Sequence, residues 1–431
     1  MLVEILEVLL FFLIFLMLIY LIRHYVFTLC VLWKIEKNIQ RSFQKDAAYQ
    51  PTVSILIPAR NEERVIGRIL QRMTELTYPK DKLQVIVIDD GSSDATGEIA
   101  ESYAKNYKYI TVLRRSSAEG GRGKASALNF GGRRAKGEII LLFDADYYPQ
   151  KDIVEKLVKA FVDPEVGAVQ GRVVVLNEPK NLVTRIVALE RIGGYRVDQQ
   201  ARENLGLIAQ FGGTVGGIRR SLLESLGGWD ENILAEDTDI TFRIYLAGYK
   251  VRYVMDAESY EEAVESWRAY WRQRYRWAKG HMQCAFKHFL SVLKSKNLRF
   301  PEKIDALLLL NVYFLPVIVL FSWILSSILL FLKTPLSTPS MMLISIILYS
   351  SAGNFAPFFE VAVGGYLDGR TRACWILPLF LLTSLYNILI CTKALLDLMM
   401  SKLRGEHDNR WIKTMHNGYG NFYIMKAGRN K

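Results

Sequence analysis

The sequence predicts an α/β fold in which a mostly parallel sheet is inserted between transmembrane helices. Two observations lead to this fold class. Long runs without charge lie near both ends of the 431-residue chain, and each is long enough to cross a bilayer. Between them, short β-rich apolar runs alternate with helical patterns, as in parallel sheets whose two faces are covered by helices.

The composition excludes two classes of protein. Hydrophobic residues make up 51% of the chain, so it can bury too much apolar surface to be intrinsically disordered. Three of its four cysteines (Cys30, Cys284, Cys374 and Cys391) lie in or beside apolar runs, which favours reduced thiols over a disulfide-stapled secreted fold. The formal net charge of +12 is typical of membrane proteins with basic cytoplasmic loops; phosphate-bearing ligands or nucleic acid are the alternatives.

The first transmembrane helix is expected over residues 8–33, where Val8–Trp33 is apolar apart from Arg23 and His24. We expect these two side chains to extend to one interface of the membrane. Acidic residues precede this helix, and basic residues follow it at Lys34, Lys37, Arg41 and Lys45. Because the cytoplasmic flanks of such helices carry the excess of Lys and Arg, we expect the polar insert in the cytoplasm and the N-terminus outside.

Further membrane segments are expected over residues 304–400. Three apolar runs lie there: Ala306–Leu332, Ser340–Phe359 and Ala373–Thr392. Three full crossings would place the tail, residues 401–431, outside, yet its basic residues favour the cytoplasm. Ser340–Leu367 contains Gly, Pro and Glu residues, which favours a re-entrant or interfacial segment. The number of crossings stays open.

The polar insert, expected as a domain over residues 48–260, contains four apolar runs of strand length. These are Val53–Pro58, Val85–Ile88, Tyr109–Leu113 and Glu138–Phe143. Helical patterns follow the first three, at Glu62–Leu76, Ala95–Asn106 and Lys124–Arg134. Polar residues cluster where strands end, at 60–62, 89–92 and 144–146. Ligands of such sheets bind beyond the carboxyl ends of the strands, so we expect one pocket to collect these clusters.

Asp144 and Asp146 indicate a metal site. Alternate residues at the end of a strand point to the same side, and two carboxylates there suit a hard cation such as Mg²⁺ or Mn²⁺. An isolated Asp-x-Asp is more often an ordinary acidic turn. The second acidic pair, Asp89-Asp90, at another strand end of the same sheet favours the metal site.

The segment Gly120–Lys124 suits phosphate binding, because it combines a flexible backbone with two cations before a helix. It does not have the P-loop pattern, and no Gly-x-Gly-x-x-Gly follows the first strand, which argues against nicotinamide and flavin cofactors. The five histidines show no zinc-ligand spacing.

Residues 261–300 are expected to form amphipathic helices at the membrane surface. Aromatic residues there alternate with basic ones, at Trp267, Tyr270, Trp271, Tyr275 and Trp277. A nucleic-acid-binding surface has a similar composition, but the neighbouring apolar runs favour the lipid interface. We therefore expect the lipid bilayer as a partner, and no nucleic acid.

Five motifs in order resemble the processive family-2 glycosyltransferases, which include cellulose, hyaluronan, chitin-oligosaccharide and poly-N-acetylglucosamine synthases. They are Pro58-Ala-Arg-Asn-Glu62, Asp89-Asp-Gly-Ser92, Asp144-Ala-Asp146, Glu236-Asp237 and Gln273-Arg-Tyr-Arg-Trp277. The resemblance covers Val53–Lys279. It implies a nucleotide-sugar-binding sheet of the GT-A type, followed by interfacial helices that carry the Gln-x-x-Arg-Trp motif.

The resemblance assigns roles on the donor side. Asp144 and Asp146 would present Mg²⁺ or Mn²⁺ to the diphosphate of a UDP-sugar, and Asp237 would be the general base that deprotonates the acceptor hydroxyl. Glu236 would support Asp237. The nucleotide-binding residues would be Arg60, Glu62, Asp90, Lys124, Asp144 and Arg276, the last of them on the leaving diphosphate.

On the acceptor side, Trp277 would stack on the acceptor sugar and Gln273 would orient it. Phe211-Gly212-Gly213-Thr214 resembles the acceptor-side loop of these enzymes. Trp411-Ile-Lys-Thr414 resembles their gating segment, although it departs from the Trp-Gly-Thr form of hyaluronan and chitin-oligosaccharide synthases.

The leading hypothesis is a multi-pass cell-membrane enzyme that transfers sugar from a UDP-sugar to a growing polysaccharide and helps to translocate the chain. One alternative is transfer of a single sugar to a lipid such as a polyprenyl phosphate. Another, from a different class, is a non-catalytic transporter or scaffold partner of a synthase. An accessory membrane subunit is left open, and the sequence does not identify the sugar.

Overall fold

An eight-stranded mixed sheet is the centre of the computed structural model, which describes residues 2–33, 49–332, 355–405 and 417–419. Its strand order is β3-β2-β1-β4-β7-β6-β8-β5. The strands are β1 (Val53–Ala59), β2 (Leu83–Asp89), β3 (Ile110–Arg114), β4 (Ile139–Leu142), β5 (Tyr148–Pro149), β6 (Val166–Val175), β7 (Gly216–Arg219) and β8 (Lys250–Glu261).

The four strands expected from the sequence are confirmed as β1 to β4, and they pair in parallel. Val53 of β1 pairs with Leu83 of β2 and with Ile139 of β4, so the carboxyl ends of these strands lie at one edge. β7 is antiparallel to β4 and to β6, which makes the sheet mixed. The sequence did not predict β5 to β8.

Helices cover both faces of the sheet. Successive side chains of β1 point to opposite faces, and both sets are buried. Ile55 and Ile57 pack in one core cluster with α2 and α5, whereas Leu56 packs in another with α4, α9 and the long helix α10 (Trp267–Lys294). The helices of the domain are α2 (Ile66–Thr74), α3 (Thr96–Asn106), α4 (Lys124–Gly132), α5 (Ile153–Val158), α6 (Leu182–Arg191), α7 (Gln200–Leu205), α8 (Arg220–Ser225) and α9 (Glu236–Leu246).

A π-helix, η5 (Ile192–Gln199), joins α6 to α7 in one continuous helical stretch. Short 3₁₀ turns complete the domain at η2 (Lys80–Lys82), η3 (Lys159–Val162) and η4 (Glu178–Lys180). π-Helical turns are rare and are frequently found at functional sites.

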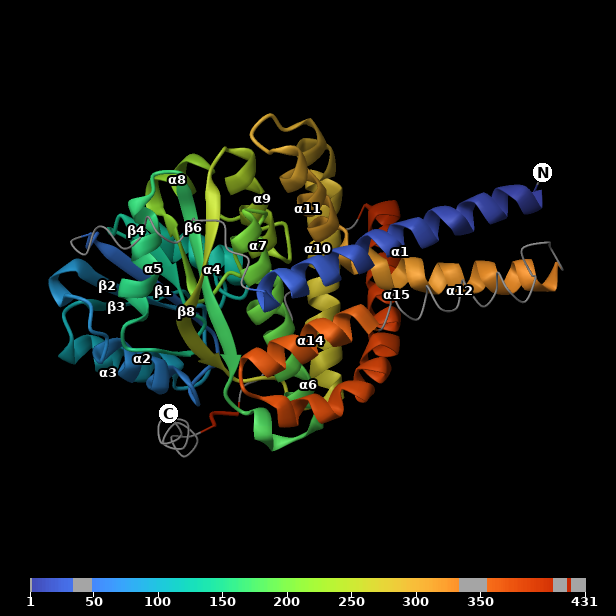
Figure 1. Cartoon of the computed structure of the whole chain (residues 1–431). Coiled ribbons are helices and arrows are strands. Elements are labelled where there is room, and N and C mark those ends of the chain that lie inside the picture. Colours follow the sequence, from blue (N-terminus) through green and yellow to red (C-terminus); the bar gives the residue numbers. More distant parts are fainter. Residues whose placement is uncertain (1, 34–48, 333–354, 406–416, 420–431) are drawn as a thin grey trace.

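Three helices are long and apolar enough to cross a membrane among the described residues, at Leu2–Leu32, Val312–Phe331 and Thr371–Arg404. Figure 1 shows α1 (Leu2–Leu32) and α12 (Leu315–Phe331) side by side, extending away from the sheet. η6 (Val312–Phe314) precedes α12.

The last long helix has a different direction. η9 (Thr371–Leu379) leads into α15 (Phe380–Arg404), which runs across α1 and α12 and packs on α10 (Trp267–Lys294) (Figure 1). α10 and α11 (Phe300–Leu310) are the helices expected at the membrane surface. The expected run Ser340–Phe359 lies mostly outside the described residues; its end begins α14 (Ala356–Leu367).

Arg23 and His24, which we expect near a membrane interface, contact acidic side chains of other elements. Arg23 forms an ion pair with Asp198 of η5, and its Nε lies 3.9 Å from Asp305 of α11. His24 Nδ1 lies 2.5 Å from Glu360 Oε2 of α14. An unpaired buried charge is costly, and the acidic partners remove that cost. The same contacts connect α1 to the domain and to α14.

The described part of the C-terminal tail contacts the domain. The backbone N–H groups of Asn417, Gly418 and Tyr419 donate to the carboxylate of Glu262, at 3.2, 3.2 and 2.9 Å. Arg68 Nη1 also donates to the carbonyl oxygen of Tyr419, at 2.8 Å. The candidate gating residues Trp411 and Thr414 lie outside the described residues.

Candidate active site

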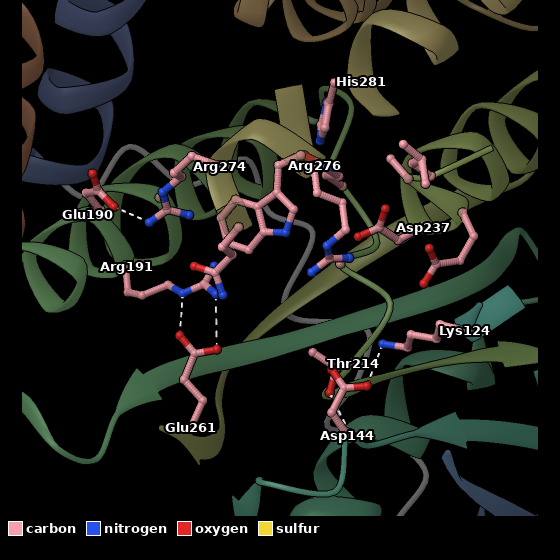
Figure 2. Close-up of a pocket in the computed structure, with 18 of the residues that line it drawn as sticks. Lys124, Asp144, Glu190, Arg191, Thr214, Asp237, Glu261, Arg274, Arg276 and His281 are labelled. Atoms are coloured by element: carbon pink, nitrogen blue, oxygen red, sulfur yellow. Dashed lines mark hydrogen bonds and ion pairs between the residues drawn. The ribbon is translucent and has the colours of Figure 1, made fainter. Parts of the chain in front are cut away.

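One cavity of about 630 Å³ extends from the carboxyl ends of β1, β2 and β4 to α10, α12 and α15. It brings together most of the residues that the sequence singled out. Those that line it are Arg60, Glu62, Asp90, Lys124, Asp144, Asp146, Gly212, Thr214, Asp237, Gln273, Arg276 and Trp277. Figure 2 shows Lys124 and Asp144 on one side and Arg276 and His281 on the other.

Asp90 and the loop before α4 form one wall. Asp90 accepts hydrogen bonds from Arg115 Nη1 at 2.7 Å and from the backbone of Gly121 at 2.9 Å. Burial raises the pKa of the Asp90 carboxyl above its usual value. Gly121 has a φ of +77°, and a Cβ there would lie 1.9 Å from Arg60 Nη1. Only glycine therefore allows this close approach to Arg60.

Lys124 lies against the first of the two metal-candidate carboxylates. Its Nζ lies 2.5 Å from Asp144 Oδ1 and donates to the carbonyl oxygen of Gly213 at 2.9 Å. Burial lowers the pKa of Lys124, but the negative charges of Asp144, Glu236 and Asp237 outweigh it and raise the pKa overall. The ammonium group therefore stays charged beside Asp144.

Asp144 and Asp146 fit a cation that is shared with a diphosphate. Asp146 is buried, and its Oδ2 accepts a hydrogen bond from the backbone of Glu262 at 3.3 Å. No group of three or more His, Cys, Asp or Glu side chains in the described part of the chain could hold a metal ion. Mg²⁺ in phosphate-transferring sites is commonly bound by one or two carboxylates together with substrate phosphates and water, which matches this pair.

Asp237 lies at the start of α9, where its Oδ1 accepts a hydrogen bond from the backbone of Thr238 at 2.7 Å. The loop 211–214 packs closely on it, since a Cβ on Gly213 (φ +70°) would lie 2.9 Å from Asp237 Cβ. Burial, and next the charge of Asp237, raise the pKa of Glu236 to about 7. Glu236 thus loses its proton near neutral pH, well above the range of an ordinary carboxyl group.

Arg276 has an unpartnered nitrogen in the cavity. Its Nε is buried and has no hydrogen-bond partner within the described residues. Figure 2 shows its side chain beside Asp237. A partly exposed guanidinium that lines the cavity and keeps an unused N–H donor is suited to an anionic ligand, above all a phosphate.

Trp277 is held by two cations. The guanidinium carbons of Arg274 and Arg191 lie 4.2 and 5.1 Å from its ring centroids. Both cations are anchored, Arg274 by Glu190 and Arg191 by Glu261, with 2.6 Å between Arg191 Nε and Glu261 Oε1 (Figure 2). These contacts orient the indole by cation–π attraction.

The loop 211–214 is divided between core and cavity. Phe211 is fully buried in the core cluster under α9, and its backbone N–H donates to Thr241 Oγ1 at 3.1 Å. Only Gly212 and Thr214 of this loop line the cavity. A large apolar side chain in this position is better buried with the aliphatic core than exposed to a polar site.

Sequence reasoning missed one wall of the cavity, which α6 and η5 provide. Its residues are Glu190, Arg191, Gly194, Tyr195, Asp198 and Gln199, and α10 adds Arg274 and His281. The pair Gly193-Gly194 inside a helical pattern was the available signal, because glycine there is unfavourable without a structural reason.

The far end of the cavity is mostly apolar. It is lined by Leu308, Leu309, Val312, Tyr313, Pro316, Asn387, Ile390 and Cys391, from the helices that follow α10 and from α15. The polar site is therefore continuous with a space between the apolar helices.

Several relatives match about three fifths of this chain. A probable glycosyltransferase, YdaM, of Bacillus subtilis is 41% identical over 61% of this chain and 63% of its own. A β-monoglucosyldiacylglycerol synthase of Trichormus variabilis is 37% identical over 59% of this chain and 54% of its own. A poly-β-1,6-N-acetyl-D-glucosamine synthase of Staphylococcus epidermidis is 29% identical over 61% and 63%. The chain thus spans less than two thirds of the length of these relatives.

The fold also matches a solved structure. A mannosyltransferase of Pyrobaculum calidifontis, solved with GDP-Man and Mn²⁺, gives a TM-score of 0.56 at 23% identity, over 83% of this chain and 98% of its own. The expected fold class, a GT-A-like mixed α/β sheet that is mostly parallel and is accompanied by long apolar helices, is confirmed. The family described as "glycosyltransferase like family 2" matches this chain over residues 51–280, which is more than half of its length. The chain therefore belongs to the family-2 glycosyltransferases.

Proposed function

We propose that this glycosyltransferase transfers a sugar from a UDP-sugar to the end of a growing polysaccharide, with inversion at the anomeric carbon. The observation that carries the proposal is the single cavity. It joins the carboxylates Asp144 and Asp146, the candidate base Asp237, the cation Arg276 and the aromatic ring of Trp277.

On the donor side, Arg60, Glu62, Asp90 and Lys124 hold the uridine diphosphate. Asp144 and Asp146 would hold Mg²⁺ or Mn²⁺, which would neutralise charge on the departing diphosphate. Arg276 binds the same leaving group through its guanidinium, whose Nε has no partner among the described residues. Positive charge is thus available where negative charge increases in the transition state.

On the acceptor side, Asp237 takes the proton of the acceptor hydroxyl as its oxygen attacks the anomeric carbon. The bond to the diphosphate breaks on the opposite side, and this single displacement inverts the centre. Trp277 stacks on the acceptor sugar, Gln273 orients it, and Gly212 and Thr214 border it. The fixed indole supplies apolar contact to a sugar face without directional bonds.

A second acceptor class is a membrane lipid that carries a hydroxyl or phosphate group. The apolar end of the cavity favours this candidate, because Leu308, Val312 and Ile390 suit hydrocarbon better than water. The relatives include both a polysaccharide synthase and a lipid-glucosylating enzyme.

We also propose that the catalytic domain and the tail both lie in the cytoplasm. The contact of residues 417–419 with Glu262 and the direction of α1 and α12 away from the sheet (Figure 1) support this arrangement. An accessory membrane subunit remains compatible with it.

The test is a donor screen with the full chain in nanodiscs, using UDP-glucose, UDP-N-acetylglucosamine and UDP-glucuronate. UDP release that excess chelator abolishes, and that is lost in Asp146→Asn, is expected. Sizing of the product then separates a polymer from a glycolipid. No UDP release with any donor would support a transporter or scaffold instead.

A further inference from the structure

His281 lies one helical turn beyond Trp277 on α10, so both side chains project from the same face of that helix and line the same cavity. Figure 2 shows His281 beyond Arg276 and Asp237, on the side away from Asp144. Its ring centroid lies 4.7 Å from that of Tyr313, which belongs to the apolar end of the cavity. His281 therefore stands where the polar site passes into the apolar space.

A hydrogen bond between Thr238 and one ring nitrogen of His281 fixes the orientation of the imidazole. Gln210 Nε2 donates to Thr238 Oγ1 at 3.0 Å, and Thr238 Oγ1 lies 3.1 Å from His281 Nε2. The hydroxyl accepts from the amide, so its own proton is available for Nε2. The other acceptor within reach of the Thr238 hydroxyl is Asp237 Oδ1, which lies farther away, at 3.4 Å from Thr238 Oγ1. In the neutral ring the proton is then on Nδ1.

The second ring nitrogen is unused. Nδ1 of His281 is buried and has no hydrogen-bond partner within the described part of the chain. Burial lowers the pKa of His281 to about 4, so the ring is neutral at physiological pH. A buried donor without a partner costs free energy, and a ligand oxygen in the cavity would remove that cost.

We propose that Nδ1–H of His281 donates a hydrogen bond to an oxygen of the acceptor next to the attacking hydroxyl, and so places that hydroxyl at Asp237. This inference rests on the proposed function and makes His281 an acceptor-binding residue. The chemical class it selects is a polyol, such as a sugar or a glycerol. Thr238 follows Asp237 in the chain and contacts His281, so base and acceptor-binding group belong to one rigid unit.

The test compares His281→Ala with His281→Asn, whose amide nitrogen keeps a donor near the position of Nδ1. Acceptors are cellobiose, chitobiose and dioleoylglycerol in nanodiscs, each with UDP-glucose, UDP-N-acetylglucosamine and UDP-glucuronate. His281→Ala is expected to raise the acceptor KM about tenfold or more, as loss of one substrate hydrogen bond predicts. UDP affinity is expected within twofold of the wild type, and slow donor hydrolysis is expected to persist. His281→Asn is expected to restore much of the acceptor KM.

Each other outcome overturns the inference. An unchanged acceptor KM in His281→Ala, while the wild type transfers sugar, refutes this role and leaves the proposed function intact. An equal loss of UDP affinity in both variants shows a structural role only. If the wild type transfers sugar to none of these acceptors from UDP-glucose, UDP-N-acetylglucosamine or UDP-glucuronate, the proposed function fails and this inference fails with it.

Discussion

At the scale of single residues, the two adjacent carboxyl groups at the start of α9 have different surroundings. Glu236 is buried, and its pKa is raised to about 7, whereas Asp237 is half-buried on the cavity wall. Pairs of titratable groups in contrasting environments are typical of acid–base sites. The more accessible position of Asp237 on the cavity wall favours it over Glu236 as the proposed base.

Asp237→Asn is therefore expected to lower turnover by about a hundredfold or more, because the amide cannot accept the acceptor's proton. UDP affinity should stay close to that of the wild type, since the shape is kept. Turnover and UDP binding measured on one preparation check this. Turnover within tenfold of the wild type would show that another residue is the base.

Glu236 makes stability depend on pH. Its folded pKa near 7 exceeds the ordinary value of 4.5, so the folded protein binds more protons than the unfolded chain between these values. This contribution is fully present below pH 4.5 and is lost as the pH rises through 7. Raising the pH from 5 to 8 is expected to lower the melting temperature of the wild type more than that of Glu236→Gln. Equal slopes for the two proteins would contradict the raised pKa.

At the scale of elements, the strands with continuous apolar runs were predictable and the others were not. β1, β2 and β4 bury nearly every side chain, and such runs are visible in a sequence. β3 is less buried, but its β-rich residues Ile110–Leu113 still mark it as a strand. β7 is Gly-Gly-Ile-Arg, and its place is set by antiparallel pairing with β4 and β6 rather than by its own residues. For the site, clusters at strand ends were predictable because topology brings them together.

The wall from α6 and η5 shows why the rest of the site was not predictable. Arg191 and Gly194 carry no motif, and they face the cavity only because of how the helix packs. Phe211 illustrates the reverse case: its motif suggested the acceptor site, yet its side chain is in the core. A motif identifies a loop, but packing decides which of its side chains face the ligand.

Trp277 of helix α10 is the residue on which the proposed acceptor site can be tested. Trp277→Ala is expected to shorten the product strongly while UDP affinity stays within about twofold, because the chain end loses the surface that holds it between transfers. Trp267→Ala is the matched control: that residue lies on the same helix, is 40% exposed and does not line the cavity. Product sizing per folded enzyme checks this. Polymer of wild-type length from Trp277→Ala would exclude the acceptor role.

At the scale of the whole molecule, the contact between the tail and the catalytic domain bears on the proposed side of the membrane for the C-terminus. Glu262 is buried, follows β8 and donates its backbone N–H to Asp146, so the tail docks beside the metal-candidate carboxylates. Lys180 adds a cation–π contact at 4.0 Å from the centroid of the Tyr419 ring. Such a contact requires the tail and the catalytic domain to share one compartment.

A protease experiment tests that requirement. In inside-out vesicles, a C-terminal epitope and the catalytic domain are both expected to be digested, whereas in intact spheroplasts both should be protected. Glu262→Ala removes the carboxylate that accepts three backbone N–H groups, so it is expected to speed cleavage of the tail several-fold without changing its side. Glu265→Ala is the milder control, because it removes only the side-chain contact to Asn417 from the tail. An epitope that stays protected in inside-out vesicles while the domain is digested would place the tail outside, and the contact with Glu262 could then not form in the membrane.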